Sequence, residues 1–369
     1  MSSISVHPLD PHDIPFYAIP TPRSTAKPFK LSVIPAGHLS IPGSLFVEGY
    51  EGNAELEDYS FLIEKADGQR LIWDLGLRQD LKYDAITKDA AKAYHGEAPT
   101  SVANVLSSQN IPLDSITSVF FSHTHFDHVS DISAFPKSVS IVLGPREKEP
   151  STDDLMNEFK VDRSGIDGRE VRFLSNDEDQ WIDVGCFKGF DYYGDSSLFI
   201  LSTPGHHPGS ISLLALTSLY PCPTYHILAG DAAHHISLLR GATIGTYKAG
   251  ENPAKKWNSE AEGNKDQSFE QDIERSARTQ TSLGRMDQEP NILVWLAHDS
   301  SMKSIVQSSP GSIHHLIGDM EEMSKIKRRT EEDFRGKPIV FGLGGRRVEL
   351  ERNMKKAAKQ EDADLHAGH

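Results

Sequence analysis

The segment SHTHFDHVSD spans residues 122–131. Six consecutive positions within it contain four side chains that can bind metal. They are His123, His125, Asp127 and His128, and they directly follow the apolar run VFF at 119–121. Imidazole nitrogens suit zinc and similar borderline metals, and carboxylates complete such sites. This loop offers more ligands than one tetrahedral ion needs from one segment, so it indicates a pair of ions. The ordinary alternative is a polar turn that carries histidines by chance, and the density of ligand types disfavours it.

Three later segments repeat this arrangement, in which an apolar run leads to a residue able to bind metal. FILSTPGHHPGS leads to His206, YHILAGD ends in Asp231, and LVWLAHD leads to His298. Each residue follows an expected strand, so we expect all three to emerge at one rim of the domain. Together with the first loop they supply enough ligands for two ions if one of them is shared.

The order and types of these seven residues resemble the pattern of the metallo-β-lactamase superfamily, which is HxHxDH, then His, then Asp, then His. The segment LIWDLG at 71–76 also resembles the family's early strand that ends in Asp and Gly, and the resemblance covers roughly residues 31 to 300. It implies an α/β fold, the αββα four-layer sandwich, with the ligands in a cleft along one edge of the two sheets. It also implies two zinc ions per chain: His123, His125 and His206 hold one ion, Asp127, His128 and His298 hold the other, and Asp231 bridges them.

Within this family, the segments GDSSLFILSTPGHHPGS and LAGDA are most similar to the lactonase branch, which includes acyl-homoserine lactone hydrolases. Those lactonases usually place a tyrosine three residues after the bridging aspartate, and this chain has His234 there. An imidazole could donate a hydrogen bond to substrate from the same place, so His234 is a candidate catalytic residue. Asp127 is the second candidate, because its other oxygen could shuttle a proton. His207, next to His206, is expected to point away from the metal.

The resemblance favours a binuclear zinc hydrolase that opens a lactone to a hydroxy acid with a hydroxide shared by two ions. A lactam hydrolase uses the same apparatus and is the closest rival. A thioesterase of the glyoxalase II kind would be expected to carry basic residues that grip the glutathione carboxylates, and a zinc-dependent RNA processor would need a basic patch. A metal-binding scaffold without activity is disfavoured by the complete set of seven ligands.

Composition limits the partners. The 369 residues carry a formal charge of −15, from 38 basic and 53 acidic residues, whereas a nucleic-acid groove needs a basic surface. The two cysteines, Cys186 and Cys222, do not make a disulfide framework and favour a reducing compartment. Neither a signal peptide nor an apolar run of about eighteen residues is visible. We therefore expect a cytoplasmic protein with a small-molecule substrate and no nucleic-acid or membrane partner.

The elements that must position these residues are short strands between turns, with a few helices, which is typical of a layered α/β domain. We expect an extended N-terminal arm over 1–30, a hydrolase domain over 31–340 with a polar insert at about 245–268, and a charged C-terminal tail over 341–369. The sequence predicts a hairpin over 59–76 around Asp67-Gly68 and further strands at 118–121, 139–145, 181–186, 198–205, 210–216, 225–231 and 291–299. Helices are expected to begin near residue 100, to span about 269–283 and 318–334, and to begin at His314 and His315.

Overall fold

The computed structural model describes residues 14–42, 52–146, 150–159, 163–177, 180–236, 239, 270–299, 302–306, 312–316 and 320–334. The predicted polar insert at 245–268, the predicted tail at 341–369 and the first part of the predicted arm lie outside these residues.

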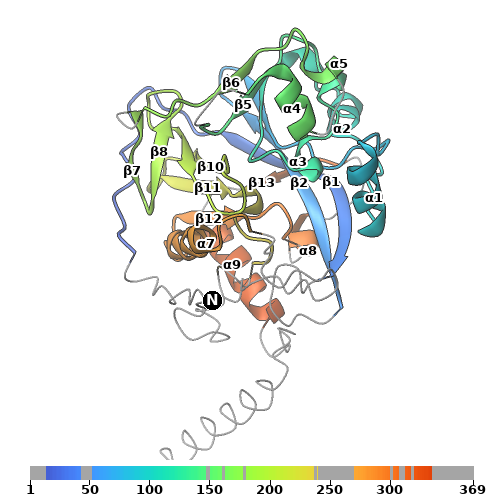
Figure 1. Ribbon diagram of the computed structural model, residues 1–369. Coiled ribbons are helices and arrows are strands. Elements are labelled where there is room, and N and C mark those ends of the chain that lie inside the picture. Colours follow the sequence, from blue (N-terminus) through green and yellow to red (C-terminus); the bar gives the residue numbers. More distant parts are fainter. Residues whose placement is uncertain are drawn as a thin grey trace, which may run out of the picture.

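Two sheets form the centre of the described part of the chain (Figure 1). The first has seven strands in the order β13 (His314–Leu316), β1 (Lys30–Pro42), β2 (Asn53–Glu64), β3 (Arg70–Trp73), β4 (Ile116–Phe120), β5 (Ser140–Leu143) and β6 (Val171–Phe173). The second has six strands in the order β12 (Ile292–Trp295), β11 (Thr224–Leu228), β10 (Ile211–Ser218), β9 (Leu198–Ser202), β8 (Phe187–Asp191) and β7 (Ile182–Val184). The predicted hairpin is the antiparallel pair of β2 and β3.

Apolar residues on both faces of the strands explain why the sheets stack. Side chains alternate along a strand, and Phe61 of β2 lies in the core between the sheets while its neighbour Leu62 lies on the opposite face. Leu213 and Leu214 of β10 divide in the same way between the central core and the outer face of the second sheet. Each sheet therefore has to be covered on its outer face as well.

Helices supply that cover. The described helices are α1 (Ala85–Ala93), α2 (Val102–Ser108), α3 (Phe126–Val129), α4 (Thr152–Phe159), α5 (Arg163–Ile166), α7 (Ile273–Asp287), α8 (Lys303–Val306) and α9 (Met320–Phe334), with short 3-10 turns η3 (Leu113–Ser115), η4 (Ile132–Ala134) and η6 (Gly230–Ala232). Helices α2, α4 and α5 pack on the outer face of the first sheet, and α7 packs on the outer face of the second (Figure 1). The αββα arrangement predicted from the sequence is confirmed.

One prediction about local structure is wrong. His314 and His315 do not begin a helix, because they lie in β13, which pairs with the edge of β1 through Leu31, Ser32 and Val33. The unpaired edge of β1 provides hydrogen-bonding groups that a local sequence pattern does not reveal, and pairing with it decides the conformation. No helix in the described ranges is long and apolar enough to cross a membrane.

Candidate metal centre

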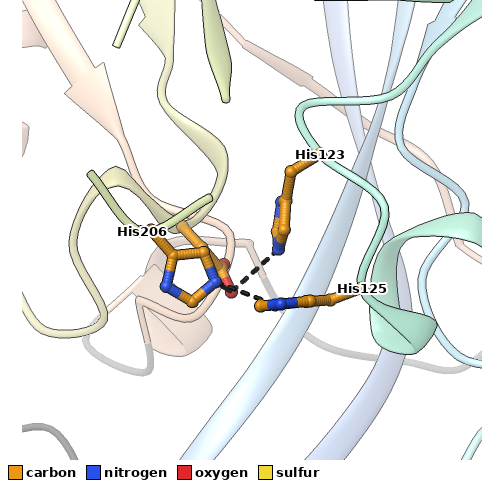
Figure 2. Close-up of side chains that lie close together, drawn as sticks. His123, His125 and His206 are labelled. Atoms are coloured by element: carbon orange, nitrogen blue, oxygen red, sulfur yellow. Dashed lines mark hydrogen bonds and ion pairs between the residues drawn. The ribbon is translucent and has the colours of Figure 1, made fainter. Parts of the chain in front are cut away.

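The seven predicted ligands lie together at one edge of the two sheets, and each belongs to a segment that follows a strand. His123, His125, Asp127 and His128 follow β4, with the last two in the short helix α3. His206 follows β9, Asp231 lies in η6 after β11, and His298 follows β12. Figure 2 shows the imidazoles of His123, His125 and His206 pointing toward one another. Residues up to 175 positions apart in the sequence are thereby brought into one cluster.

Backbone contacts between the sheets fix these loops. The Ile211 N–H, at the start of β10, donates to the carbonyl of Ser122 at 2.9 Å, and the Tyr59 N–H of β2 donates to the carbonyl of Ala297 at 3.1 Å. Each acceptor immediately precedes a predicted ligand. Gly230 has a φ of +53°, and a Cβ there would lie 2.5 Å from the Ser122 Cβ. Only glycine therefore allows the Asp231 loop to approach the His123 loop this closely.

A first group of candidate ligands gathers around one oxygen of Asp231. The Asp231 Oδ2 atom lies 3.7 Å from His123 Nε2 and 3.5 Å from His206 Nε2. The same His206 nitrogen lies 2.9 Å from His125 Nδ1. One donor atom from each of these four residues falls within 4.8 Å of every other, which suits a single metal ion.

A second group gathers around the other oxygen. Asp231 Oδ1 lies 3.2 Å from His128 Nε2 and 3.0 Å from His298 Nε2. Asp127 Oδ2 lies 3.6 Å from the same His298 nitrogen, and these four donors also fall within 4.8 Å of one another. Asp231 thus faces a different set of imidazoles with each of its oxygens.

Three further carboxylates face the outer nitrogens of these histidines. Asp74 Oδ2 lies 3.0 Å from His128 Nδ1, while its Oδ1 accepts the Ser122 N–H at 2.7 Å. Asp58 Oδ1 lies 2.9 Å from His298 Nδ1, and Glu270 Oε2 lies 3.4 Å from His206 Nδ1. A carboxylate at the outer nitrogen fixes the tautomer and leaves Nε2 to the metal. Asp74 is the aspartate of the LIWDLG segment, whereas nothing in the sequence marks Asp58 or Glu270.

The donor set fits a divalent cation. The Nε2 atoms of His123 and His128 and the Oδ1 atom of Asp231 are buried, and none makes a hydrogen bond within the described residues. Buried polar atoms without such partners are costly, and acceptor nitrogens that converge on a carboxylate oxygen need positive charge between them. A bound metal ion in each group would meet both requirements with the ligand types that zinc prefers.

The electrostatics of the two groups differ. Burial would raise the pKa of the Asp231 carboxyl, but the imidazoles of His128 and His298 hold this pKa well below its usual range. Burial would lower the pKa of His128, but the carboxylates of Asp231 and Asp74 hold it well above the ordinary value. For His123, burial and the neighbouring His128 both act to lower the pKa. His123 is therefore ready as a neutral ligand, whereas metal binding at the second group must displace a proton from His128.

Two histidines outside the predicted ligand set, His234 and His207, are buried and lie beside it. His234 Nε2 lies 3.3 Å from Asp231 Oδ2, and His234 Nδ1 lies 3.6 Å from Glu270 Oε1. His207 Nε2 lies 3.4 Å from Thr124 Oγ1, and its Nδ1 accepts the Gly209 N–H. His234 thus faces the first group of ligands, and His207 bonds with neighbouring polar groups instead.

Known proteins resemble the chain in sequence and in fold. A model of the metallo-beta-lactamase superfamily matches residues 56–216. Gamma-lactamase FDB1 of Fusarium pseudograminearum is 33% identical over 218 residues, which cover 54% of this chain and 51% of that protein, so the chain spans about half of this relative. Gamma-lactamase MBL2 of Gibberella moniliformis is 34% identical over 176 residues, which cover 46% of this chain and 73% of that protein.

A crystal structure of a quorum-quenching N-acyl homoserine lactone lactonase has the same fold, with a TM-score of 0.52 and 17% identity over 80% of this chain and 100% of that chain. The predicted family is confirmed by the sequence matches together with this fold. The chain belongs to the metallo-β-lactamase superfamily.

Proposed function

We propose that the protein is a binuclear zinc hydrolase that opens a cyclic ester to a hydroxy acid. The observation that carries this proposal is the position of Asp231, which directs one oxygen to His128 and His298 and the other to His123 and His206. A bridging carboxylate with nitrogen donors on both sides is an arrangement that suits two ions. His123, His125, His206 and Asp231 would hold the first ion, and Asp127, His128, His298 and Asp231 would hold the second.

Two divalent ions bound in this way would lower the pKa of water toward about 7 and polarise a substrate carbonyl. The chain's own residues then determine where the reaction occurs. His125 is partly exposed and Asp127 is 8% exposed, whereas the other predicted ligands are 3% exposed or less. Water and substrate therefore reach the cluster from the side of His125 and Asp127.

Asp127 is proposed to move the proton. Its Oδ2 atom faces the His298 ring at 3.6 Å, which leaves the second oxygen of the same carboxylate for a proton. That oxygen would accept a proton from the attacking water and return it to the leaving oxygen of the ester. In a cyclic ester the leaving oxygen stays tethered to the acyl group, so the proton has only a short distance to travel and one hydroxy acid results.

A cyclic amide is the second candidate substrate. Two relatives of this chain, FDB1 and MBL2, are named gamma-lactamases. Opening a lactam requires the same attack on a carbonyl and the same return of a proton, in this case to a nitrogen. A thioester is a third possibility, and a metal-binding scaffold without activity is the alternative outside enzymes.

A hydrolysis screen on the zinc-loaded protein tests the proposal. The panel contains a γ-butyrolactone, an N-acyl homoserine lactone, a γ-lactam and a glutathione thioester, each followed by mass spectrometry of the product. We expect ring opening of a lactone that chelation abolishes and added zinc restores, and no turnover by the Asp231→Ala variant. Faster opening of the lactam would select the second candidate. Fully zinc-loaded protein that cleaves none of the four would contradict the hydrolase assignment.

A further inference from the structure

His234 contacts the same Asp231 oxygen as two predicted ligands of the first ion. Its Nε2 atom is 3.3 Å from Asp231 Oδ2, which is closer to this oxygen than His206 Nε2 at 3.5 Å or His123 Nε2 at 3.7 Å. The centroid of its ring is 4.8 Å from that of His206. The residue is 1% exposed, so its imidazole is buried within the cluster.

Glu270 holds His234 and His206 as a pair. Its Oε1 atom faces His234 Nδ1 at 3.6 Å and its Oε2 atom faces His206 Nδ1 at 3.4 Å. One carboxylate therefore turns both imidazoles so that each Nε2 is directed at the same Asp231 oxygen. This is the relation that Asp74 has to His128 and Asp58 to His298 in the second group.

The backbone fixes Glu270 beside His206. The Gln271 N–H donates to the carbonyl of His206 at 3.3 Å, and the Asp272 N–H donates to the carbonyl of Gly205 at 2.8 Å. Asp272 also caps the N-terminus of α7 by accepting the Arg275 N–H at 3.0 Å. The segment that carries Glu270 is thus joined both to the His206 loop and to a fifteen-residue helix, which makes the position of its carboxylate specific.

We propose that His234 is a fifth protein ligand of the first metal site, and that Glu270 is the positioning residue that directs His234 and His206 to it. This inference rests on the proposed function, because it assumes that the first group binds metal. The first ion would then have five protein donors (His123, His125, His206, Asp231 and His234), and the second would have four. With fewer protein donors, the second site keeps more room for substrate, since catalytic zinc sites retain an open position.

A third ion between Glu270 and the two Nδ1 atoms is a different interpretation of the same cluster, because donor atoms of His206, His234 and Glu270 also fall within 4.8 Å of one another. That ion would bind His206 and His234 through Nδ1. The inner nitrogens would then lie against Asp231 Oδ2 and would be lost to the first site. The Nε2 atoms of His123, His206 and His234 all lie within 3.7 Å of the same Asp231 oxygen, and this favours ligation through Nε2.

The test measures zinc retention, which does not depend on turnover. Wild type, His234→Ala, His234→Gln, Glu270→Gln and Glu270→Ala are loaded with zinc and titrated against a graded series of chelator, and retained zinc is counted by elemental analysis. We expect wild type to bind two ions, and both His234 variants to release the more tightly held one at least about 100-fold more readily. Glu270→Gln should weaken retention roughly 10- to 100-fold, because an amide has one acceptor oxygen for two imidazole N–H groups.

Substitution with Co²⁺ supplies a spectroscopic readout of the ligands. The visible absorption of the bound cobalt should change in both His234 variants, because a nitrogen donor is lost. His207→Ala is the matched control, since His207 is an adjacent buried histidine whose nitrogens face Thr124 and the Gly209 N–H. This variant should keep the zinc retention and the cobalt spectrum of wild type. Circular dichroism shows which variants fold, and the comparison uses His234→Gln if His234→Ala does not fold.

The outcomes separate the inference from the proposed function. Wild-type zinc retention and an unchanged cobalt spectrum in a folded His234 variant would overturn the inference and leave the hydrolase proposal standing. Three ions in wild type and two in Glu270→Ala would replace it with the third-ion interpretation. Wild-type protein that binds no zinc at all would instead contradict the proposed function.

Discussion

Replacing Asp231 with asparagine tests the two-ion arrangement most directly. The amide keeps the size of the side chain but provides only one acceptor oxygen. The shorter contacts are those of Oδ1 with His128 Nε2 at 3.2 Å and His298 Nε2 at 3.0 Å. An amide NH2 on that side can donate a hydrogen bond to each of these Nε2 atoms. The Nδ1 atoms of the same two rings face Asp74 and Asp58. We therefore expect Asp231→Asn to keep the first ion and to lose the second.

Elemental analysis of Asp231→Asn should find a fall from about two zinc ions per chain to about one. The affinity for the second ion should decrease by at least about 100-fold, which corresponds to roughly 2.7 kcal/mol. Asp58→Asn is the graded comparison, because its amide oxygen can still accept from His298 Nδ1, and it should retain both ions with about a 10-fold loss of affinity. Two ions bound to Asp231→Asn with wild-type affinity would show that this carboxylate is not the bridge.

Three further predictions concern stability and pH. Removing zinc with a chelator should lower the melting temperature, because zinc at 100 times its dissociation constant stabilises the native state by about 2.7 kcal/mol. Calorimetric scans with and without chelator measure the difference in melting temperature. Equal melting temperatures would contradict metal binding. Urea titrations of the metal-free protein should show the greatest stability near about pH 6.5. The raised pKa of His128 contributes stability that is lost as the pH rises above this value. The lowered pKa of His123 contributes stability that is lost as the pH falls below it. A monotonic rise or fall from pH 5 to 8 would be inconsistent with these opposite shifts. Arg169→Lys should lower the free energy of unfolding by about 3 kcal/mol. The buried guanidinium donates to five backbone carbonyls between η4 and α5, and an ammonium cannot reach them all. A loss below about 0.5 kcal/mol in a urea titration would refute this role.

The resemblance of the ligand pattern to the metallo-β-lactamase superfamily implied the fold class, and the seven candidate ligands could be located because each lies in a short segment that follows an apolar run. That signal is local: Asp231 can be found from YHILAGD and His298 from LVWLAHD without knowledge of the rest of the chain. Asp58 and Glu270 carry no such signal. Asp58 lies within β2, Glu270 precedes α7, and their partners His298 and His206 are 240 and 64 residues away. The packing of the two sheets brings Asp58 to His298, and backbone hydrogen bonds between the segment before α7 and the His206 loop bring Glu270 to His206.

The role of His234 shows a different limit of the sequence. The resemblance to lactonases implies a tyrosine three residues after the bridging aspartate, and on that resemblance His234, which holds this position, is predicted to donate a hydrogen bond to substrate. This role stays a prediction. The structure directs one His234 nitrogen to Asp231 and the other to Glu270, which favours the metal-ligand role proposed above over donation to substrate.

The three outer carboxylates explain how so many histidines can be buried in one place. A buried imidazole is stable as a neutral ligand only if its outer N–H has an acceptor, and Asp58, Asp74 and Glu270 each lie within 3.6 Å of such a nitrogen. The same carboxylates add buried negative charge, which water does not screen in the interior. Bound cations are the natural compensation for this charge, and the carboxylates would therefore strengthen metal binding while they orient the ligands. Each group of ligands combines residues that follow β4 of the first sheet with residues that follow strands of the second. A change in how the sheets pack would therefore disturb both metal sites together.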